Sequence, residues 1–249
     1  MARTGRPRGF DRDEAVTQAM HLFWEHGFEG TSLDQLRRAM GGISSASFYA
    51  AFGSKKALYR ETLDAYLRGH GMVMAALRDE SLSPRDRLEQ ALRRSAVMQT
   101  EADHPTGCMV TLSATICSAD ASVVRSLTAA ERAANREAIR TCVDTAIADG
   151  TLRSGTDPFG LAALFDGLLV GLSIQARDGV SGEQLNAAVT QVLRAWDTNS
   201  STSGGAGTGS PADNRLRVNG RPWQKRPSAH RSWNDLWWSR LCGNALNML

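Results

Sequence analysis

The sequence has few cysteines and no clear targeting or membrane segment. Its four cysteines form no C-x-x-C pair and are too sparse for a disulfide framework, which is typical of a reducing compartment. The most apolar run, residues 159–176, is interrupted by Asp166, Ser173 and Gln175, so we expect no membrane span and no membrane partner. The N-terminus is basic but lacks the apolar segment of a secretory signal. These absences predict a cytoplasmic protein.

Motifs for catalysis and cofactor binding are also missing. The sequence contains no G-x-S-x-G elbow, no P-loop and no G-x-G-x-x-G after a strand. His21 and His26 lie five residues apart, which does not place two ligands on one helical face, so we expect no metal site. No catalytic residue and no cofactor is predicted, and an enzyme ranks third among the possible functions.

Charge is distributed unevenly along the 249 residues, although 29 Lys and Arg against 26 Asp and Glu give a net charge of only +3. Residues 1–60 carry +3, residues 61–197 carry −5 and residues 198–249 carry +5. Such asymmetry indicates a polyanionic partner for one end and a different task for the middle.

The composition changes sharply near residue 198. The stretch TNSSTSGGAGTGSPAD is a linker with nothing to bury, and four of the six tryptophans follow it among seven basic residues. We expect residues 198–249 to be a linker and a disordered basic, Trp-rich tail. Sequence-independent nucleic-acid binding by stacking and charge is the alternative for this tail.

Helical periodicity dominates the chain up to that linker. Apolar spacing, capping residues and glycines predict helices from Asp11 to Gly27, over 33–40, over 45–52, and from Ser54 towards Leu77. Later helices are expected from Pro84, over 108–118, 120–148, 158–177 and 182–196. The predicted fold is all-α, with a three-helix helix-turn-helix (HTH) domain over 1–60 and a helical bundle over 61–197.

The segment TSLDQLRRAMGGISSASFYAAFGSKKALYRETL resembles the HTH signature of TetR-family transcriptional repressors. The likeness rests on residues in the family's order: Thr31-Ser32-Leu33, Ile43-Ser44, Phe48-Tyr49, Phe52, Gly53-Ser54-Lys55 and Leu58. Two departures are the longer Gly41-Gly42 turn and Arg37, which stands where a small residue is usual. The resemblance implies a DNA-binding regulator whose second domain binds a ligand and forms a dimer.

Three sets of residues are candidates for contact with double-stranded DNA. The start of the third helix presents Ser44, Ser45, Ala46 and Ser47 to base edges. The resemblance implies phosphate contacts by Thr31, Tyr49 and Lys55, and Lys55 also lies at a helix N-terminus, which favours an anion. Residues 1–10 form a flexible basic arm with Arg3, Arg6 and Arg8, which either follows the DNA or is a solvated tail.

Two apolar stripes in the middle segment are candidates for a homodimer interface. The resemblance implies that the last two helices pair with their copies. Close approach is favoured by a stripe of small residues, and a second stripe follows on the last helix. The predicted interface residues are Ala163, Gly167, Gly171, Leu168, Leu185, Val189, Val192 and Trp196. A bundle core within one chain explains both stripes as well.

A pocket for an unknown small-molecule effector is predicted near HPTGCMVTLSATICS, which resembles a pocket-facing segment of the family. Its candidate residues are Cys108, Met109 and Leu112, with plain core packing as the alternative. Together these features predict a repressor that binds a palindromic operator as a dimer and is released by a small molecule. The alternative is a small-molecule-binding helical protein whose HTH has been repurposed.

Overall fold

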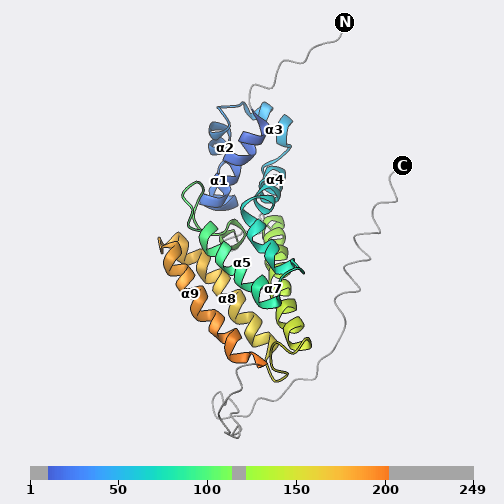
Figure 1. The fold of residues 1–249 in the computed structure, drawn as a ribbon. Coiled ribbons are helices and arrows are strands. Elements are labelled where there is room, and N and C mark those ends of the chain that lie inside the picture. The colour runs from blue at the N-terminus through green and yellow to red at the C-terminus, as the bar shows by residue number, and fades with distance from the viewer. Residues whose placement is uncertain (1–10, 114–121, 202–249) are drawn as a thin grey trace, which may run out of the picture. The chain divides into compact units, whose positions relative to one another are not determined.

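The computed structural model describes residues 11–113 and 122–201, which form an all-helical fold (Figure 1). Within these ranges the only extended pairing is one isolated bridge between Leu152 and Ser200. The all-α fold class predicted from the sequence is confirmed. The N-terminal arm with Arg3, Arg6 and Arg8 lies outside the described residues, as does the chain beyond residue 201.

The first three helices begin where local chemistry predicts, although the first one continues past its expected end at Gly27. Helix α1 spans Arg12–Gly30 and is capped by Asp11, whose carboxylate accepts hydrogen bonds from two backbone amides of the first turn. Helix α2 spans Leu33–Ala39 and opens with a capping box between Ser32 and Gln35. Helix α3 spans Ser45–Phe52 and is capped by Ser44.

These helices share a core with α4, which spans Lys55–Arg68. The side chains that fill this core are fully or almost fully buried, among them Phe23, Trp24, Leu36, Phe48, Leu58 and Tyr59. This core, called the first core below, also includes Tyr66, Met98 and Met109, which come from beyond residue 60. The expected domain boundary at residue 60 therefore lies inside a continuous helix.

The fourth helix is shorter than expected. We predicted that it continues towards Leu77, but the backbone leaves the helical region at Gly69 (φ −109°, ψ −105°) and continues as the 3-10 helix η1, His70–Arg78. Glycine favours such a break because it lacks a Cβ. The break lets the chain turn and pack η1 against α5, which spans Pro84–Met98.

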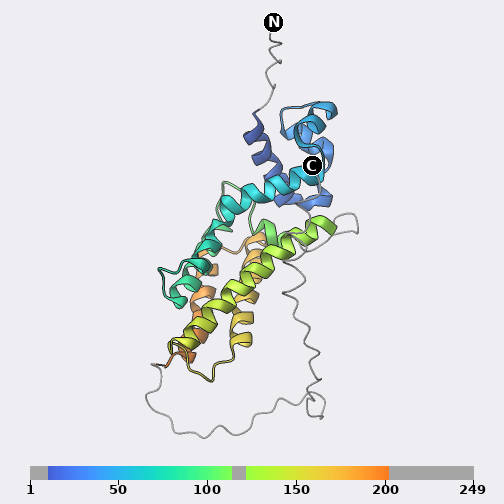
Figure 2. The same cartoon turned by 90° about the vertical axis from the view of Figure 1, so that its right-hand side faces the viewer.

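The remaining helices enclose a second core. They are α6 (Met109–Leu112), α7 (Ser122–Ala148), α8 (Pro158–Arg177) and α9 (Gly182–Asn199). Figure 2 shows the long helix α7, which packs against α8, α5 and η1. Helix α8 also packs against α9, so its inner side is covered from two directions by apolar residues such as Ile139, Phe165 and Trp196.

Candidate DNA-binding surface and ligand cavity

The turn between α2 and α3 is held by backbone bonds and by one arginine. Gly41 and Gly42 both have positive φ angles, 78° and 74°, in the left-handed region that favours glycine. Their amides donate to the carbonyls of Arg38 and Arg37. The side chain of Arg37 donates from Nε to the Ile43 carbonyl at 2.8 Å. The unusual arginine and the longer turn thus belong together, since Arg37 spans the turn and fixes the start of α3.

The first turn of α3 exposes short polar side chains. Ser44 accepts a hydrogen bond from the Ser47 amide at 3.0 Å, and the two hydroxyls lie 2.9 Å apart. Ser45 and Ala46 are exposed between them. Tyr49 is 52% exposed, whereas its neighbour Phe48 is fully buried, so one ring supports the helix and the other faces outward. This surface has the polarity and small size of a helix end that enters a groove of DNA.

The start of α4 presents two lysines with different surroundings. The ammonium of Lys55 lies 4.4 Å from the centre of the Phe28 ring, a cation–π contact, and the side chain is half-buried. This burial lowers the pKa of Lys55. Lys56 is exposed at the same helix N-terminus, where free amides also favour an anion. Lys56 is a further candidate for a phosphate contact, indicated in the sequence by the Gly-Ser-Lys-Lys step.

Thr31 has a structural role that we did not predict. Its side chain is fully buried, and its hydroxyl lies 2.7 Å from the Gly27 carbonyl and 3.1 Å from the Leu22 carbonyl. Gly27 interrupts α1 with φ 72° and ψ 173°, which frees carbonyls that need donors. The hydroxyl proton is therefore used inside the protein. This corrects the expectation that the Thr31 side chain contacts a phosphate.

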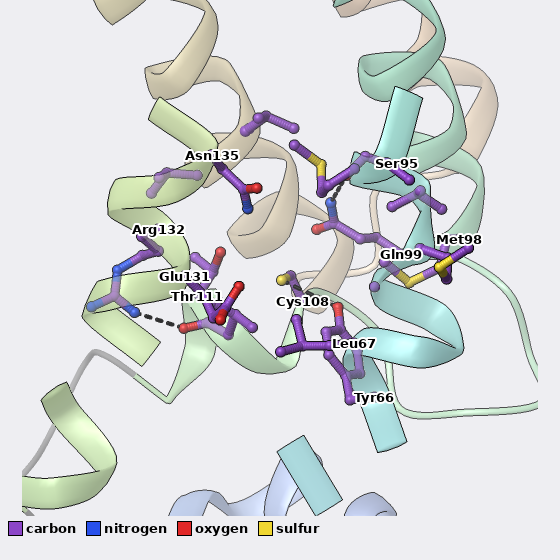
Figure 3. A pocket seen from close by; sticks show the side chains of 18 of the residues that line it. Tyr66, Leu67, Ser95, Met98, Gln99, Cys108, Thr111, Glu131, Arg132 and Asn135 are labelled. Carbon is purple, nitrogen blue, oxygen red and sulfur yellow. Dashed lines mark hydrogen bonds between the residues drawn. The ribbon is translucent and has the colours of Figure 1, made fainter. Parts of the chain in front are cut away.

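A cavity of about 290 Å³ lies between η1, α5, α6, α7 and α8 (Figure 3). Cys108 lines it, and its sulfur accepts a hydrogen bond from the buried Tyr66 hydroxyl at 3.3 Å. Burial, and next the neighbouring Cys108, raise the pKa of Tyr66 well above its usual value. Met109 is fully buried and Leu112 packs on the first core, and neither lines the cavity. Of the three predicted pocket residues, only Cys108 is placed there.

Polar groups reach the cavity from opposite sides. Figure 3 shows Gln99 and Ser95 on one side and Asn135, Arg132 and Thr111 on the other. Gln99 is 1% exposed, and its Nε2 donates to Ser95 Oγ at 2.6 Å. Its Oε1 is buried and has no hydrogen-bond partner among the described residues. An unpaired buried carbonyl is costly, so a ligand that donates a hydrogen bond there gains affinity.

Charge in the cavity comes from Asp166, Glu131, Arg132 and Arg78. Burial raises the pKa of Asp166, and the nearby guanidinium groups of Arg136 and Arg132 oppose this. Burial also lowers the pKa of Arg132, which donates to the Val110 carbonyl at 2.8 Å. The rest of the wall is largely apolar, with Leu67, Met72, Val73, Met74, Met98, Leu169 and Val170. An apolar cavity with a few converging polar groups is the usual form of a small-molecule site.

One face of α8 is apolar yet exposed within the single chain. Phe159, Leu164, Val170 and Ile174 keep between 40% and 71% of their area exposed. Ala163 and Gly167 are exposed on the same helix. A Cβ added at Gly167 would meet no atom within 4 Å, so packing among the described residues does not explain this glycine.

Helix α8 is also long and apolar enough to cross a membrane, and no other helix in the described ranges passes that test. Length and composition alone are weak grounds for a membrane span, since core helices of soluble proteins pass as well. About a third of its apolar window is buried against the rest of the fold. A helix that is apolar on all sides is normally buried on all sides. The exposed side of α8 is therefore expected to pack against another protein surface or a membrane.

The α9 stripe faces inward. Leu185, Val189 and Trp196 are fully buried in the second core, and Val192 and Leu168 are half-buried against it. A side chain with no exposed area in one chain has none to lose to a second chain. This corrects the interface prediction for Leu185, Val189 and Trp196, which are core residues. Ala163 and Gly167 remain available, and Gly171 is half-buried.

Comparison with known families covers both parts of the fold. Residues 16–62 match the family described as "Bacterial regulatory proteins, tetR family", and residues 84–192 match the "Tetracyclin repressor-like, C-terminal domain". Together the two matches span more than half of the chain. The protein belongs to the TetR family. Members of this family are DNA-binding transcriptional regulators and not enzymes, which confirms the expectation of a non-enzymatic function.

Individual TetR-family proteins resemble this one over most of their length. The HTH-type transcriptional repressor ComR of Escherichia coli is 33% identical over 193 residues, 77% of this chain and 91% of that protein. A cysteine mutant of the TetR family regulator CifR, solved with a 26-base-pair operator DNA, is 42% identical. That match covers 77% of this chain and all of the CifR chain, with a TM-score of 0.70.

Proposed function

We propose that this TetR-family protein is a repressor that binds a palindromic operator as a homodimer and leaves it when a small molecule fills the cavity. The observation that carries the proposal is the coexistence of an exposed HTH surface and an apolar cavity with an unpaired buried acceptor, Gln99 Oε1. Relatives support the first part, since ComR is a repressor and CifR is solved on operator DNA. A regulator of this kind acts where the genome is, in the cytoplasm.

We assign recognition of the DNA sequence to the first turn of α3, within an HTH domain over 1–60. Ser44, Ser45, Ala46 and Ser47 offer hydroxyls and a methyl group, which read fewer base features than an arginine fork would. Specificity therefore depends partly on DNA shape. Tyr49, Lys55, Lys56 and the arm with Arg3, Arg6 and Arg8 supply the contacts to phosphates. Such contacts position the protein and make its affinity depend on salt.

We assign the contact with the second copy of the chain to the exposed face of α8, within a ligand-binding and dimerisation domain over 61–197. Gly167 supports this assignment because a mid-helix glycine costs about 1 kcal/mol relative to alanine, and no contact within residues 11–113 and 122–201 requires it. A partner helix that approaches closely would require it. Two readers related by twofold symmetry then meet half-sites about 34–36 Å apart on the DNA.

Release of the protein from the operator depends on a difference in the affinity of the ligand for two arrangements of the protein. A ligand shifts the population away from the operator-bound arrangement only if it binds the free arrangement more tightly. The cavity walls come from η1, α5 and α6 as well as from α7 and α8, so a ligand between them changes how these helices pack. The favoured ligand class is a small, mostly apolar molecule with at least one hydrogen-bond donor.

A DNA selection with the full-length protein tests the proposal. Random duplexes are enriched on the protein, and the expected product is an inverted repeat whose half-sites lie about one helical turn apart. Enrichment of a single half-site, or of no sequence, would overturn the dimeric reader. Enrichment of no sequence together with stabilisation by a small molecule would favour the repurposed ligand binder instead.

Point variants assign the phosphate contacts on the selected operator. Tyr49→Ala and Lys56→Ala are expected to weaken binding about fivefold to tenfold each, and loss of Lys56 lowers the salt slope by about one unit. The control is Arg194→Ala, which removes one positive charge from an exposed position on α9, outside the helices of the HTH domain. Operator affinity unchanged in both Tyr49→Ala and Lys56→Ala would contradict these roles.

A further inference from the structure

We propose a second ligand site in the loop after α5, where Glu101, Asp103 and His104 bind a divalent transition-metal cation. One ligand atom from each residue lies within 4.8 Å of the other two. The site is separate from the cavity, whose lining includes none of the three. Metal binding here goes beyond the proposed repressor function and can be measured without DNA.

The spacing of the ligand atoms fits a first-row metal. His104 Nε2 lies 3.5 Å from Glu101 Oε2 and 3.7 Å from Asp103 Oδ1. Tetrahedral bonds of about 2.0–2.2 Å place neighbouring ligand atoms roughly 3.3–3.6 Å apart. The two distances to His104 Nε2 therefore fit a cation with shifts of a few tenths of an ångström, and the two carboxylate oxygens, within 4.8 Å of each other, belong to exposed side chains that can close on it.

His104 is prepared as a ligand. Its Nδ1 lies 3.0 Å from the Pro105 carbonyl oxygen, and because a carbonyl only accepts, Nδ1 carries the proton that it donates. In the neutral ring this leaves the lone pair on Nε2. The side chain is fully buried, and Nε2 has no hydrogen-bond partner in the described part of the chain. A backbone carbonyl that fixes the tautomer is the usual partner behind a metal-bound histidine.

The carboxylates complete the site from the solvent side. The side chain of Glu101 is 48% exposed and that of Asp103 is 78% exposed, so a hydrated cation reaches them without opening the core. One imidazole and two carboxylates favour zinc, cobalt, nickel or copper over calcium or magnesium, which prefer oxygen ligands alone. Water takes the remaining coordination positions.

The position of the proposed metal site links the loop after α5 to the HTH domain. The His104 ring stacks on Trp24 of α1, with ring centres 4.5 Å apart and planes at 17°. His70 of η1 meets the His104 ring edge-on at 4.3 Å. The loop is closed at its base by the Gly107 amide, which donates to the Gln99 carbonyl at 2.9 Å. A bound metal would hold this closed loop, through His104, against α1.

Zinc titration of the metal-free full-length protein tests the site by calorimetry and by thermal unfolding. We expect one zinc per chain and a rise of the unfolding midpoint by several degrees at saturating metal. Asp103→Asn and Glu101→Gln change exposed side chains and should fold, and each is expected to weaken zinc binding at least tenfold. His104→Gln should abolish it. The controls are Glu80→Gln and His26→Gln, which change exposed side chains outside the site. Both should bind zinc as the parent does.

The variants also distinguish this site from a zinc site at the Cys108 thiol. Zinc binding that survives in Asp103→Asn and Glu101→Gln, or that is lost in Cys108→Ser, would overturn the proposal. Absence of zinc binding in the parent would also overturn it. In the nitrogen-15 spectrum of the histidine rings, zinc should shift the Nε2 signal of His104 and leave that of His26 in place.

Discussion

Arg177, in the last turn of α8, reaches Glu25 of α1 across 152 residues of sequence, with Nη1 3.1 Å from the Glu25 carboxylate. The same guanidinium donates to the Glu25 carbonyl and, at 3.3 Å, to the carbonyl of Thr106. One side chain therefore joins α8, α1 and the loop that carries His104. Because α8 also carries the exposed apolar face, Arg177 connects the proposed dimer helix with the DNA reader.

Arg177→Gln is expected to lower the free energy of unfolding by about 1 kcal/mol, because a partly exposed ion pair contributes little and two carbonyls lose a charged donor. Urea unfolding measures this. Arg94→Gln is the control, since the exposed Arg94 side chain bonds Gln90 within α5, and this change should cost less, below about 0.5 kcal/mol. Equal losses in the two variants would mean that the contacts between elements add no stability.

Thr31→Val should destabilise the protein by about 1–2 kcal/mol, because it keeps the shape of the side chain but removes the donor to the Gly27 and Leu22 carbonyls. Thr17→Val is the control, since its hydroxyl bonds to Asp13 at the surface of α1, and we expect a change below about 0.5 kcal/mol. Operator affinity of folded Thr31→Val should equal that of the parent. A loss of affinity without a loss of stability would restore the phosphate role of Thr31.

Local signals predicted the helices well because their ends are encoded by single residues. The bounds of α3 and α8 agree with the prediction, since Ser44, Gly53, Asp157 and Pro158 mark those ends. The break at Gly69 was missed, because the apolar periodicity continues through η1 and only the packing of η1 on α5 shows where the chain turns.

The site residues were harder to predict because sequence periodicity shows that a stripe is buried but not what buries it. The stripe of Leu185, Val189 and Trp196 is equally compatible with a partner chain and with the core of one chain. Gln99 gave no signal, since a single polar residue after a helix is common, and its unpaired oxygen depends on Ser95 and on the cavity around it.

Ala163→Arg is expected to convert the proposed dimer into a monomer, because the charge would lie in the apolar face of α8. Ala133→Arg on α7 is the matched control, a helical alanine changed in the same way outside that face, and it should remain dimeric. Analytical ultracentrifugation of both variants at micromolar concentration measures this. A dimeric Ala163→Arg would move the interface away from this face.

Gly167→Ala distinguishes the effect of this residue on helix stability from its effect on the proposed dimer interface. Alanine favours the helix by about 1 kcal/mol, and its methyl group meets no atom within 4 Å in the described part of the chain. The variant should therefore unfold later than the parent as an isolated chain but dissociate more readily as a dimer, because the methyl group separates the paired helices. Tighter association would show that Gly167 is not at the point of closest approach.

Asp166→Asn tests the electrostatics of the cavity through pH. Burial raises the pKa of Asp166 above its unfolded value, so the ionised carboxylate is less favourable in the folded protein than in the unfolded chain. At pH 7 the ionised group therefore lowers stability, and the neutral asparagine should raise the unfolding midpoint. As the pH falls through the raised pKa, the parent takes up a proton and this penalty disappears, so the two midpoints should converge towards about pH 4.

Thermal unfolding at constant ionic strength, from neutral pH down to the pH of convergence, measures this difference between Asp166→Asn and the parent. Asp144→Asn is a poor control because Asp144 is paired with Arg140, whereas Asp64→Asn changes an exposed carboxylate on α4 and should show no such convergence. A destabilised Asp166→Asn at pH 7 would instead mean that the attraction of Arg132 and Arg136 exceeds the cost of burial, since removing the negative charge would then remove more stability than it restores.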